Sequence, residues 1–496
     1  MSPLLVFGII AAYFSILLLI SYLTSRKASN DSFFTADKQS PWYVVAFGMI
    51  GASLSGVTFI SVPGEVGAFI PGTEEFKAFT YFQLVLGYLL GYFVIANVLL
   101  PMYYKLNLIS IYTYLKTRYG IKSYQTGSLF FLLSQTMGAS LRLLLVAGVL
   151  QLAFFNSYNI PFEITALVTI LLIWVYTFRG GMKTIIWTDT LQTTFMLSAV
   201  VISMYIIADD LNLSTAGIIE TIKSSPYSKT WDWDWQSSKF FVKQFFAGAF
   251  IAIVMTGLDQ NMMQKNLTCR NIKDAKKNIY WLSIILVPVN LLFLSLGVLL
   301  YVYAQKNGIE IPKFSDDLYP TLAINNFTAF AGIVFLLGIV AAAFSSADSA
   351  LTSLTTAFCV DFMNLKKKSE KRQKAIRLGV HIAFSVIMYV IIIVFSKFND
   401  RSIISTVFTV AGYTYGPLLG LFAFGLFTKI KVTDNWLIPV AAVIAPLASY
   451  IINIYSKELF GGYQFGFEII ILNGALMFLA LFLLSLRKKI NPVKNF

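Results

Sequence analysis

Long apolar segments recur along the whole sequence, and they limit the possible fold more than any other feature. The chain has 496 residues, of which 57% are hydrophobic and only 12% are charged. Many of the apolar segments reach the length of about 20 residues that a helix needs to cross the hydrocarbon core of a bilayer. Because lipid cannot pair with backbone polar groups, segments of this length favour helices over a barrel of strands. We therefore expect an all-α membrane protein embedded in a lipid bilayer.

We predict about thirteen transmembrane segments and no folded soluble domain, so that residues 1–496 form one polytopic membrane domain. The first apolar segment lacks a basic N-terminal region, which predicts a retained helix and not a cleaved signal. The expected spans are 3–24, 43–70, 76–104, 123–154, 160–178, 184–208, 239–263, 277–304, 327–362, 374–397, 402–427, 435–455 and 466–486.

Basic residues are divided unequally between the two sets of loops. Most of the 38 Lys and Arg residues lie after the first, third, fifth, seventh, ninth and eleventh segments and in the C-terminal tail. Positive charge marks cytoplasmic loops, so we expect the N-terminus outside and the C-terminus inside. The net charge of +14 then reflects cytoplasmic loops beside anionic lipid and does not predict a nucleic-acid partner. We expect a monomer in the plasma (inner) membrane.

Two of the expected helices contain glycine-rich breaks at corresponding places. The segment 43–70 holds Gly51-Ala-Ser-Leu-Ser-Gly, and the segment 239–263 holds Gly248 and Gly257. These segments begin two sets of five helices, and because five is odd the second set is inverted relative to the first. Interrupted helices in two inverted halves indicate a secondary transporter with a binding site near the membrane midplane. The expected repeats are 43–208 and 239–427, with one extra N-terminal helix at 3–24 and two extra C-terminal helices at 435–486.

Within the segment 327–362, the stretch Val340–Thr356 combines small residues and hydroxyls with one carboxylate, Asp348. Small residues allow another backbone to come close, and hydroxyl oxygens are suitable ligands for a hard cation. The same pattern also fits ordinary helix packing in lipid, so both interpretations stay open at this point. On a helix, one face is shared by Ala342, Ser345, Ser346 and Ser349.

Asp189, at the start of the segment 184–208, is a second candidate cation ligand. An acid in the first turn also favours the helix dipole, which is the alternative explanation for it. Sodium, like calcium, is a hard cation that prefers oxygen ligands. The break in the segment 43–70 would add free carbonyl groups. The oxygen set predicted for sodium is Asp189, Ser345, Asp348 and Ser349.

Arg142 is the clearest charge inside a predicted membrane helix. Burying a lone cation there costs at least about 2.5–3.5 kcal/mol, which favours a functional role. Arginine grips a carboxylate through two parallel hydrogen bonds, so Arg142 predicts a site for a small organic anion. The alternatives are a side chain that reaches the interface or a pair with a structural carboxylate. Further polar groups near mid-depth are candidate substrate contacts: Ser53, Ser55, Thr58 and Gln83.

No phosphate-binding loop, dinucleotide fingerprint, metal motif or nucleophile–base pair is found in the sequence. The two cysteines, Cys269 and Cys359, predict neither a disulfide framework nor a metal site. An ATP-driven pump or a membrane enzyme is therefore not predicted.

Three motifs resemble the sodium/solute symporter family, which includes sodium/glucose, proline, iodide and sialic acid symporters. They are Arg179–Gln192, Asp259–Leu267 and the stretch around Ser345-Ser346, and the resemblance covers the ten helices of the two repeats. It implies a LeuT-type inverted-repeat fold and alternating access driven by sodium.

The resemblance also implies roles for individual residues. A first sodium site would use carbonyl groups of Gly51, Leu54 and Ala342 with the hydroxyls of Ser345 and Ser346. A second sodium site, used by some members, would use Asp189, Ser345, Asp348 and Ser349. Asp348 departs from the sialic acid symporter pattern, which has a hydroxyl at this position, so it could hold sodium or a proton.

The sialic acid symporters give the closest substrate pattern, because Arg142 falls where their carboxylate-binding arginine lies. Phe79, Gln83, Ser53, Ser55 and Thr58 match further contact positions approximately. The leading hypothesis is a sodium symporter for a sugar acid such as sialic acid. The alternatives are a sodium symporter for a neutral solute (a hexose, inositol or an amino acid) and a non-transporting sensor or channel with this fold.

Overall fold

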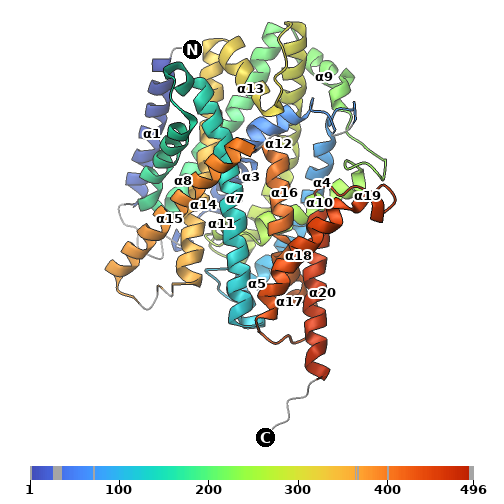
Figure 1. Ribbon diagram of the computed structural model, residues 1–496. Coiled ribbons are helices and arrows are strands. Elements are labelled where there is room, and N and C mark those ends of the chain that lie inside the picture. The colour runs from blue at the N-terminus through green and yellow to red at the C-terminus, as the bar shows by residue number, and fades with distance from the viewer. Residues whose placement is uncertain are drawn as a thin grey trace.

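A computed structural model describes residues 3–25, 36–70, 73–363, 365, 368–398 and 402–490 (Figure 1). In this part of the chain no sheet forms, and the extended backbone is limited to isolated bridges such as Ser40 with Cys269. The expectation of an all-α protein is confirmed. The basic cluster expected at 366–368 and the end of the C-terminal tail lie partly or wholly outside the described residues.

The first half of the chain contains the helices α1 Pro3–Ser25, α3 Trp42–Glu65, α4 Thr80–Val94, α5 Leu100–Lys105, α6 Thr113–Arg118, α7 Ile121–Ala153, α8 Phe162–Asp210 and α9 Thr215–Ser224. The second half contains α10 Phe241–Ala252, α11 Gln260–Asn266, α12 Ile272–Lys306, α13 Leu318–Thr321, α14 Ala329–Asp361, α15 Glu370–Phe398, α16 Ile403–Thr414, α17 Gly416–Phe427, α18 Leu437–Ile454, α19 Ser456–Leu459 and α20 Ile469–Ile490. Three π-helical turns follow α-helices directly: Ile95–Leu99 joins α4 to α5, Ile253–Gly257 ends α10, and Leu322–Asn326 ends α13.

Among the described residues, ten helices are long and apolar enough to cross a membrane, and two bent pairs raise the number to twelve. The bent pairs are α10 with α11, at 69°, and α16 with α17, at 48°. The expected segment 160–178 corresponds to a shorter apolar helix, Phe162–Trp174, so the count of thirteen is not confirmed.

The segments 160–178 and 184–208, expected as separate helices, belong to one helical element, α8. Glu163, near the start of α8, shares a cavity with Asp316, and Ser203 Oγ lies 2.6 Å from Tyr319 Oη. Because both ends of α8 reach the 315–321 region, the chain must turn back between them. The two halves of α8 can therefore each cross the membrane once, in opposite directions.

The helices form a layered bundle in which α3 and α14 lie inside and others cover them (Figure 1). Most residues of α3 and α14 are buried. In contrast, α1, α15 and α18 expose large apolar side chains such as Phe7, Val390 and Leu447. A helix that is apolar on its exposed face suits a lipid environment, so the polar groups of α3 and α14 are kept in the protein interior.

Candidate functional site

The interior helix α3 is broken at Ser55. Its backbone angles there, φ 37° and ψ 172°, lie outside the helical region, although α3 continues on both sides. Positive φ is uncommon for any residue other than glycine and marks a constrained position. Such a break leaves nearby backbone carbonyls without their regular partners in the helix. The discontinuity expected in the segment 43–70 is therefore confirmed, and it lies in the middle of the buried helix.

The backbone of α3 packs closely on α8 just before this break. Gly51 N donates a hydrogen bond to Thr193 Oγ1 at 3.1 Å, and a methyl group added at Gly51 would lie 2.3 Å from that oxygen. A methyl group at Gly48 would lie 3.0 Å from Asp189 Cβ. Glycine is thus needed at Gly51 for the contact between the two helices, and this contact brings Asp189 beside α3.

The helix α14 closes the other side of the break. A methyl group at Gly56 would lie 3.6 Å from Ala343 Cα. Ser345 Oγ donates to Asp189 Oδ1 at 2.7 Å, and Ser346 Oγ donates to the Ala343 carbonyl oxygen at 2.9 Å. The groups expected in the first sodium site therefore belong to two segments in close contact, and their carbonyl and hydroxyl oxygens suit a hard cation.

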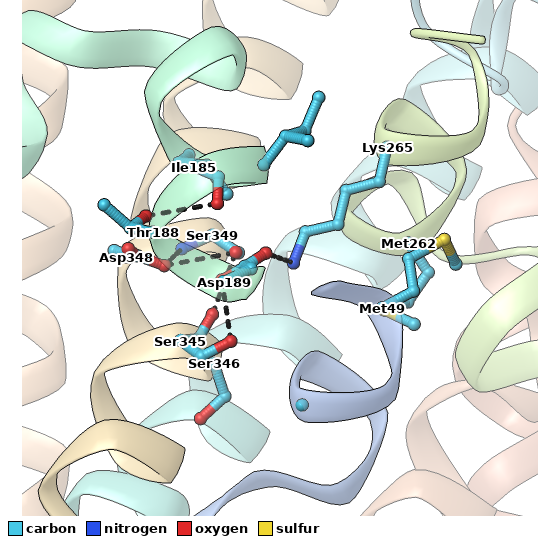
Figure 2. Close-up of polar contacts among 12 residues, drawn as sticks. Met49, Ile185, Thr188, Asp189, Met262, Lys265, Ser345, Ser346, Asp348 and Ser349 are labelled. Atoms are coloured by element: carbon cyan, nitrogen blue, oxygen red, sulfur yellow. Dashed lines mark hydrogen bonds and ion pairs between the residues drawn. The ribbon is translucent and has the colours of Figure 1, made fainter. Parts of the chain in front are cut away.

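The groups expected in the second sodium site are arranged differently. Asp189 Oδ2 forms an ion pair with Lys265 Nζ at 2.6 Å, and both side chains are only 1% exposed. Asp348 Oδ1 accepts hydrogen bonds from the backbone N and the Oγ of Ser349. In Figure 2, Lys265 reaches Asp189 from one side, and Asp348 and Ser349 lie on the other. Lys265 was not predicted as part of any site.

A central cavity of about 90 Å³ lies against the broken part of α3. Four of the six predicted substrate contacts line it: Ser53, Ser55, Thr58 and Arg142. Phe79 and Gln83 do not line this cavity. Gln83 Nε2 instead donates to the Lys239 carbonyl oxygen at 3.0 Å, and Phe79 is buried just before α4. The structure therefore brings four of the six predicted substrate-binding residues together at the central cavity.

Leu54, which was predicted as a ligand of the first sodium site, also lines this cavity. The same broken turn of α3 therefore carries groups predicted for the solute and groups predicted for sodium. This arrangement follows from the local backbone, because residues on either side of a break can face in different directions.

Three amide side chains that were not predicted also line the central cavity. The buried atoms Gln135 Nε2, Asn261 Oδ1 and Asn290 Oδ1 have no hydrogen-bond partner among the described residues. A buried polar atom without a partner costs about 1–3 kcal/mol, so these atoms favour a polar ligand in the cavity. The sequence could have indicated these three residues, because each is a polar residue in an apolar helix or at a helix break.

A carboxylate, Asp259, lines the cavity together with Arg142 and Tyr415. Asp259 Oδ1 accepts from Met262 N at 3.1 Å and so caps α11, and Asp259 Oδ2 accepts from Tyr415 Oη. For Arg142, no hydrogen bond or ion pair within 4.0 Å is found among the described residues. The guanidinium therefore keeps its donors available to a ligand, with Asp259 bound to other groups.

Aromatic side chains separate the central cavity from a much wider cavity of about 1630 Å³. The Tyr81 and Phe408 rings stack with their centroids 6.4 Å apart, and the Phe408 and Phe467 rings meet edge to face at 5.1 Å. Tyr81 and Phe408 line the central cavity, whereas Phe467 lines the wide one. Lys239 also lines the wide cavity, and its Nζ lies 5.6 Å from the centroid of the Phe467 ring.

The sequence profile described as the Sodium:solute symporter family matches residues 33–435. The chain belongs to this family. Its members are transporters, and the family name states the coupling to sodium. The match extends from just before α3 to just before α18, so it includes the broken helix, both candidate sodium sites and the central cavity.

Two curated relatives are similar over most of their length. The chain is 26% identical over 446 residues to the sodium/sialic acid symporter NanT of Aliivibrio fischeri, covering 86% of this chain and 83% of the relative. It is 24% identical over 456 residues to the sodium/sialic acid symporter SiaT of Proteus mirabilis, covering 89% of each. Relatives with other names include the human sodium/iodide cotransporter, at 23% identity over 84% of this chain and 64% of the relative.

Solved structures confirm the fold class. A sodium-coupled sialic acid symporter in a substrate-bound outward-open state superimposes with a TM-score of 0.79 and 20% identity, over 97% of this chain and 98% of that one. Mhp1, a transporter of the nucleobase–cation symport-1 family, gives a TM-score of 0.58 and 15% identity, over 94% and 97%. The protein is therefore a multi-pass membrane transporter with a LeuT-type fold.

Proposed function

We propose that the protein imports a sugar acid such as sialic acid together with sodium, by alternating access. The observation that carries this proposal is Arg142, whose guanidinium lines the central cavity without an ion pair to any described residue. A solute carboxylate would provide that pair through two parallel hydrogen bonds. The names of the two sialic acid symporter relatives agree with this class of solute.

The unpartnered amides support a solute that carries hydroxyl groups as well as a carboxylate. Gln135 Nε2 is a donor, and Asn261 Oδ1 and Asn290 Oδ1 are acceptors. Hydroxyl groups both donate and accept, so one polyhydroxylated ring could satisfy all three atoms. A site built to bond hydroxyl groups discriminates strongly against analogues that lack them, because its buried groups are then left unpaired.

The first sodium site is proposed at the break of α3, with the carbonyls of Gly51, Leu54 and Ala342 and the hydroxyls of Ser345 and Ser346. Sodium there would hold α3 against α14 and fix the turn that carries Ser53 and Ser55. A solute that binds this fixed turn would bind more tightly when sodium is present. By linkage, the solute would raise the affinity for sodium by the same factor.

The central cavity must enlarge before it can hold such a solute. Its volume of about 90 Å³ is smaller than the roughly 300–1,000 Å³ of ordinary small-molecule sites. The Tyr81–Phe408 pair separates it from the wide cavity, so movement of these two rings would provide both the space and the path. Solute entry is therefore proposed from the side of the wide cavity.

A neutral solute is the second candidate, and one observation favours it. Asp259 lines the same cavity as Arg142, so the two charges together leave the site with no net charge. A hexose, inositol or zwitterionic amino acid would then bind without bringing an unpaired charge. In this case Arg142 would have a structural role.

The proposed placement of the molecule follows the distribution of basic loops. We place the protein in the plasma (inner) membrane as a monomer, with its N-terminus outside and its C-terminus in the cytoplasm. The two inverted repeats are proposed at 43–208 and 239–427, flanked by the extra segments 3–24 and 435–486.

Uptake by proteoliposomes tests the proposed function. Purified protein is reconstituted with sodium-free interior buffer, and accumulation of radiolabelled sialic acid is measured with sodium or choline outside. We expect accumulation that depends on the sodium gradient. Arg142→Gln should reduce uptake at low solute concentration by about 10–100-fold, because charged hydrogen bonds contribute about 1.5–3 kcal/mol. Arg142→Lys, the matched control, should retain part of the activity because it keeps the positive charge.

The other hypotheses predict different results in the same assay. A neutral-solute symporter would accumulate a hexose, inositol or an amino acid and would keep that activity in Arg142→Gln. A sensor or channel would accumulate no solute from a broad panel under a sodium gradient, and this result would reject the symporter proposal.

A further inference from the structure

The ion pair between Lys265 and Asp189 occupies the position at which a second cation was expected. Of the four ion pairs among the described residues, it is the one in which both side chains are only 1% exposed. Lys265 belongs to α11, the short helix after the 69° bend, and Asp189 belongs to α8. The bend returns the lysine into the protein interior, where its ammonium group reaches the carboxylate (Figure 2).

Both oxygens of the Asp189 carboxylate already have partners. Oδ2 is 2.6 Å from Lys265 Nζ, and Oδ1 accepts the Ser345 hydroxyl at 2.7 Å. An ammonium group and a sodium ion both carry one positive charge, so in a buried site of low dielectric constant they repel each other strongly. The lysine can only donate hydrogen bonds and offers sodium no ligand. The residues around Asp189 therefore do not fit a sodium ion while Lys265 is in place.

The lysine is also held firmly in this position. Separating it from Asp189 would leave two unpaired charges inside the protein, which is strongly unfavourable. Its backbone is fixed as well, because the Lys265 carbonyl oxygen accepts from Thr268 Oγ1 at 2.6 Å. The next residue, Asn266, accepts through its Oδ1 from Asn278 Nδ2 at 2.6 Å. These contacts connect α11 to α12 and keep the lysine directed toward α8.

We propose that Lys265 is a built-in cation that takes the place of a second sodium ion, so that the transporter couples one sodium ion to each cycle. The inference rests on the proposed function, because it assumes that the first sodium site at the α3 break binds sodium. In this proposal Lys265 determines how many sodium ions are coupled to each cycle and does not contact the solute. The tethered ammonium joins α11, α8 and α14 through Asp189 and Ser345, as a bound ion would.

Counting sodium ions on the purified full-length protein tests the inference without any solute. Equilibrium binding of radioactive sodium should saturate at one ion per wild-type chain. Lys265→Met removes the charge and keeps an unbranched side chain, so Asp189 becomes available and the count should rise to two. Lys265→Arg, the matched control, keeps a cation beside Asp189 and should stay at one.

A double variant protects the test against misfolding of Lys265→Met. Asp189→Asn combined with Lys265→Met removes both charges, so no buried charge remains unpaired, and its sodium count should equal that of the wild type. If Lys265→Met is unstable, its melting temperature should rise more with sodium chloride than with choline chloride, and more than that of the wild type.

Several outcomes would overturn the inference: two ions on the wild type, one ion on folded Lys265→Met, or a lower count for the double variant than for the wild type. Failure of the proposed function looks different, because a wild-type protein that binds no sodium at all would reject the first sodium site itself.

Discussion

At the scale of single residues, the central cavity is lined by a buried amide group, on Asn290, that is only partly hydrogen-bonded. Asn290 is 1% exposed, and its Nδ2 donates to the Leu286 carbonyl oxygen at 2.7 Å within its own helix. Its Oδ1 has no partner among the described residues. Asn278, on the same helix α12, also has an unpartnered Oδ1, but its Nδ2 bonds Asn266 and it does not line the central cavity.

We expect Asn290→Leu to fold at least as stably as the wild type while binding the solute about tenfold more weakly. Leucine has a similar size and removes the unpaired acceptor, whereas the loss of one hydrogen bond to the solute costs about 1 kcal/mol or more. Thermal melting and the KM of sodium-driven uptake measure the two effects. Asn278→Leu is the control, and it should lower the stability and leave the KM nearly unchanged. A lower melting temperature with an unchanged KM for Asn290→Leu would remove this residue from the site.

Residue spacing was sufficient to predict some contacts and not others. Ser345 was placed on the helix face that meets Asp189 because residues three and four apart share a face, and the two side chains are in contact. Lys265 could not be placed in this way. It lies in a polar stretch after an apolar helix, where sequence reasoning expects a solvated loop, and only the bend between α10 and α11 brings it to Asp189.

At the scale of helices, the positions of glycine residues predicted two of the helix breaks but did not predict all of them. The interruption of α3 lies within Gly51–Gly56, and the bend after α10 lies at Gly257. The bend between α16 and α17 was not predicted, although Gly416-Pro417 follows it directly and proline cannot continue a helix without losing a hydrogen bond. The junction inside α8 was expected as a separate loop, and the side chains at 175–181 lie outside the described residues.

Two other glycines, Gly87 in α4 and Gly248 in α10, allow these two helices to pack with their backbones in contact. A methyl group at Gly87 would lie 1.9 Å from the Phe245 carbonyl oxygen, and one at Gly248 would lie 1.9 Å from the Leu84 carbonyl oxygen. Small residues at such crossings are typical of membrane helix pairs. The close contact keeps Gln83 of α4 beside the start of α10, where its Nε2 donates to the Lys239 carbonyl oxygen.

Alanine at either glycine should push these helices apart. We expect Gly87→Ala and Gly248→Ala each to lower the stability by about 1–3 kcal/mol, because backbone atoms cannot move away as a flexible side chain can. Gly138→Ala in α7 is the matched control, since no atom lies within 4 Å of a methyl group there. This control should be neutral or slightly stabilising, because alanine favours helix over glycine. Thermal melting of the purified proteins measures the difference, and equal melting temperatures for all three variants would contradict the close contact.

At the scale of the whole molecule, the long apolar segments predicted the all-α membrane class, and the family resemblance implied the LeuT-type fold. Neither fixed the number of membrane passes. The unequal distribution of basic residues between the two sets of loops predicts the orientation in the membrane. The structure places loops of the two sets at opposite ends of the molecule. In Figure 1, α9 lies near the end of the molecule where α1 begins, and α17 ends at the opposite end. The two free cysteines, Cys269 and Cys359, are buried, so an introduced cysteine can be labelled against a low background.

The orientation predicts opposite labelling of two exposed positions, Ser224 at the end of α9 and Lys429 in the loop after α17. The basic loops should face the cytoplasm, because positive charge is retained on that side during insertion. In right-side-out vesicles, a membrane-impermeant maleimide should label Ser224→Cys at once and Lys429→Cys only after permeabilisation. The wild-type chain is the control and should stay unlabelled in both conditions. The reverse pattern would place the wide cavity on the cytoplasmic side and would require solute release, and not entry, through the Tyr81–Phe408 pair.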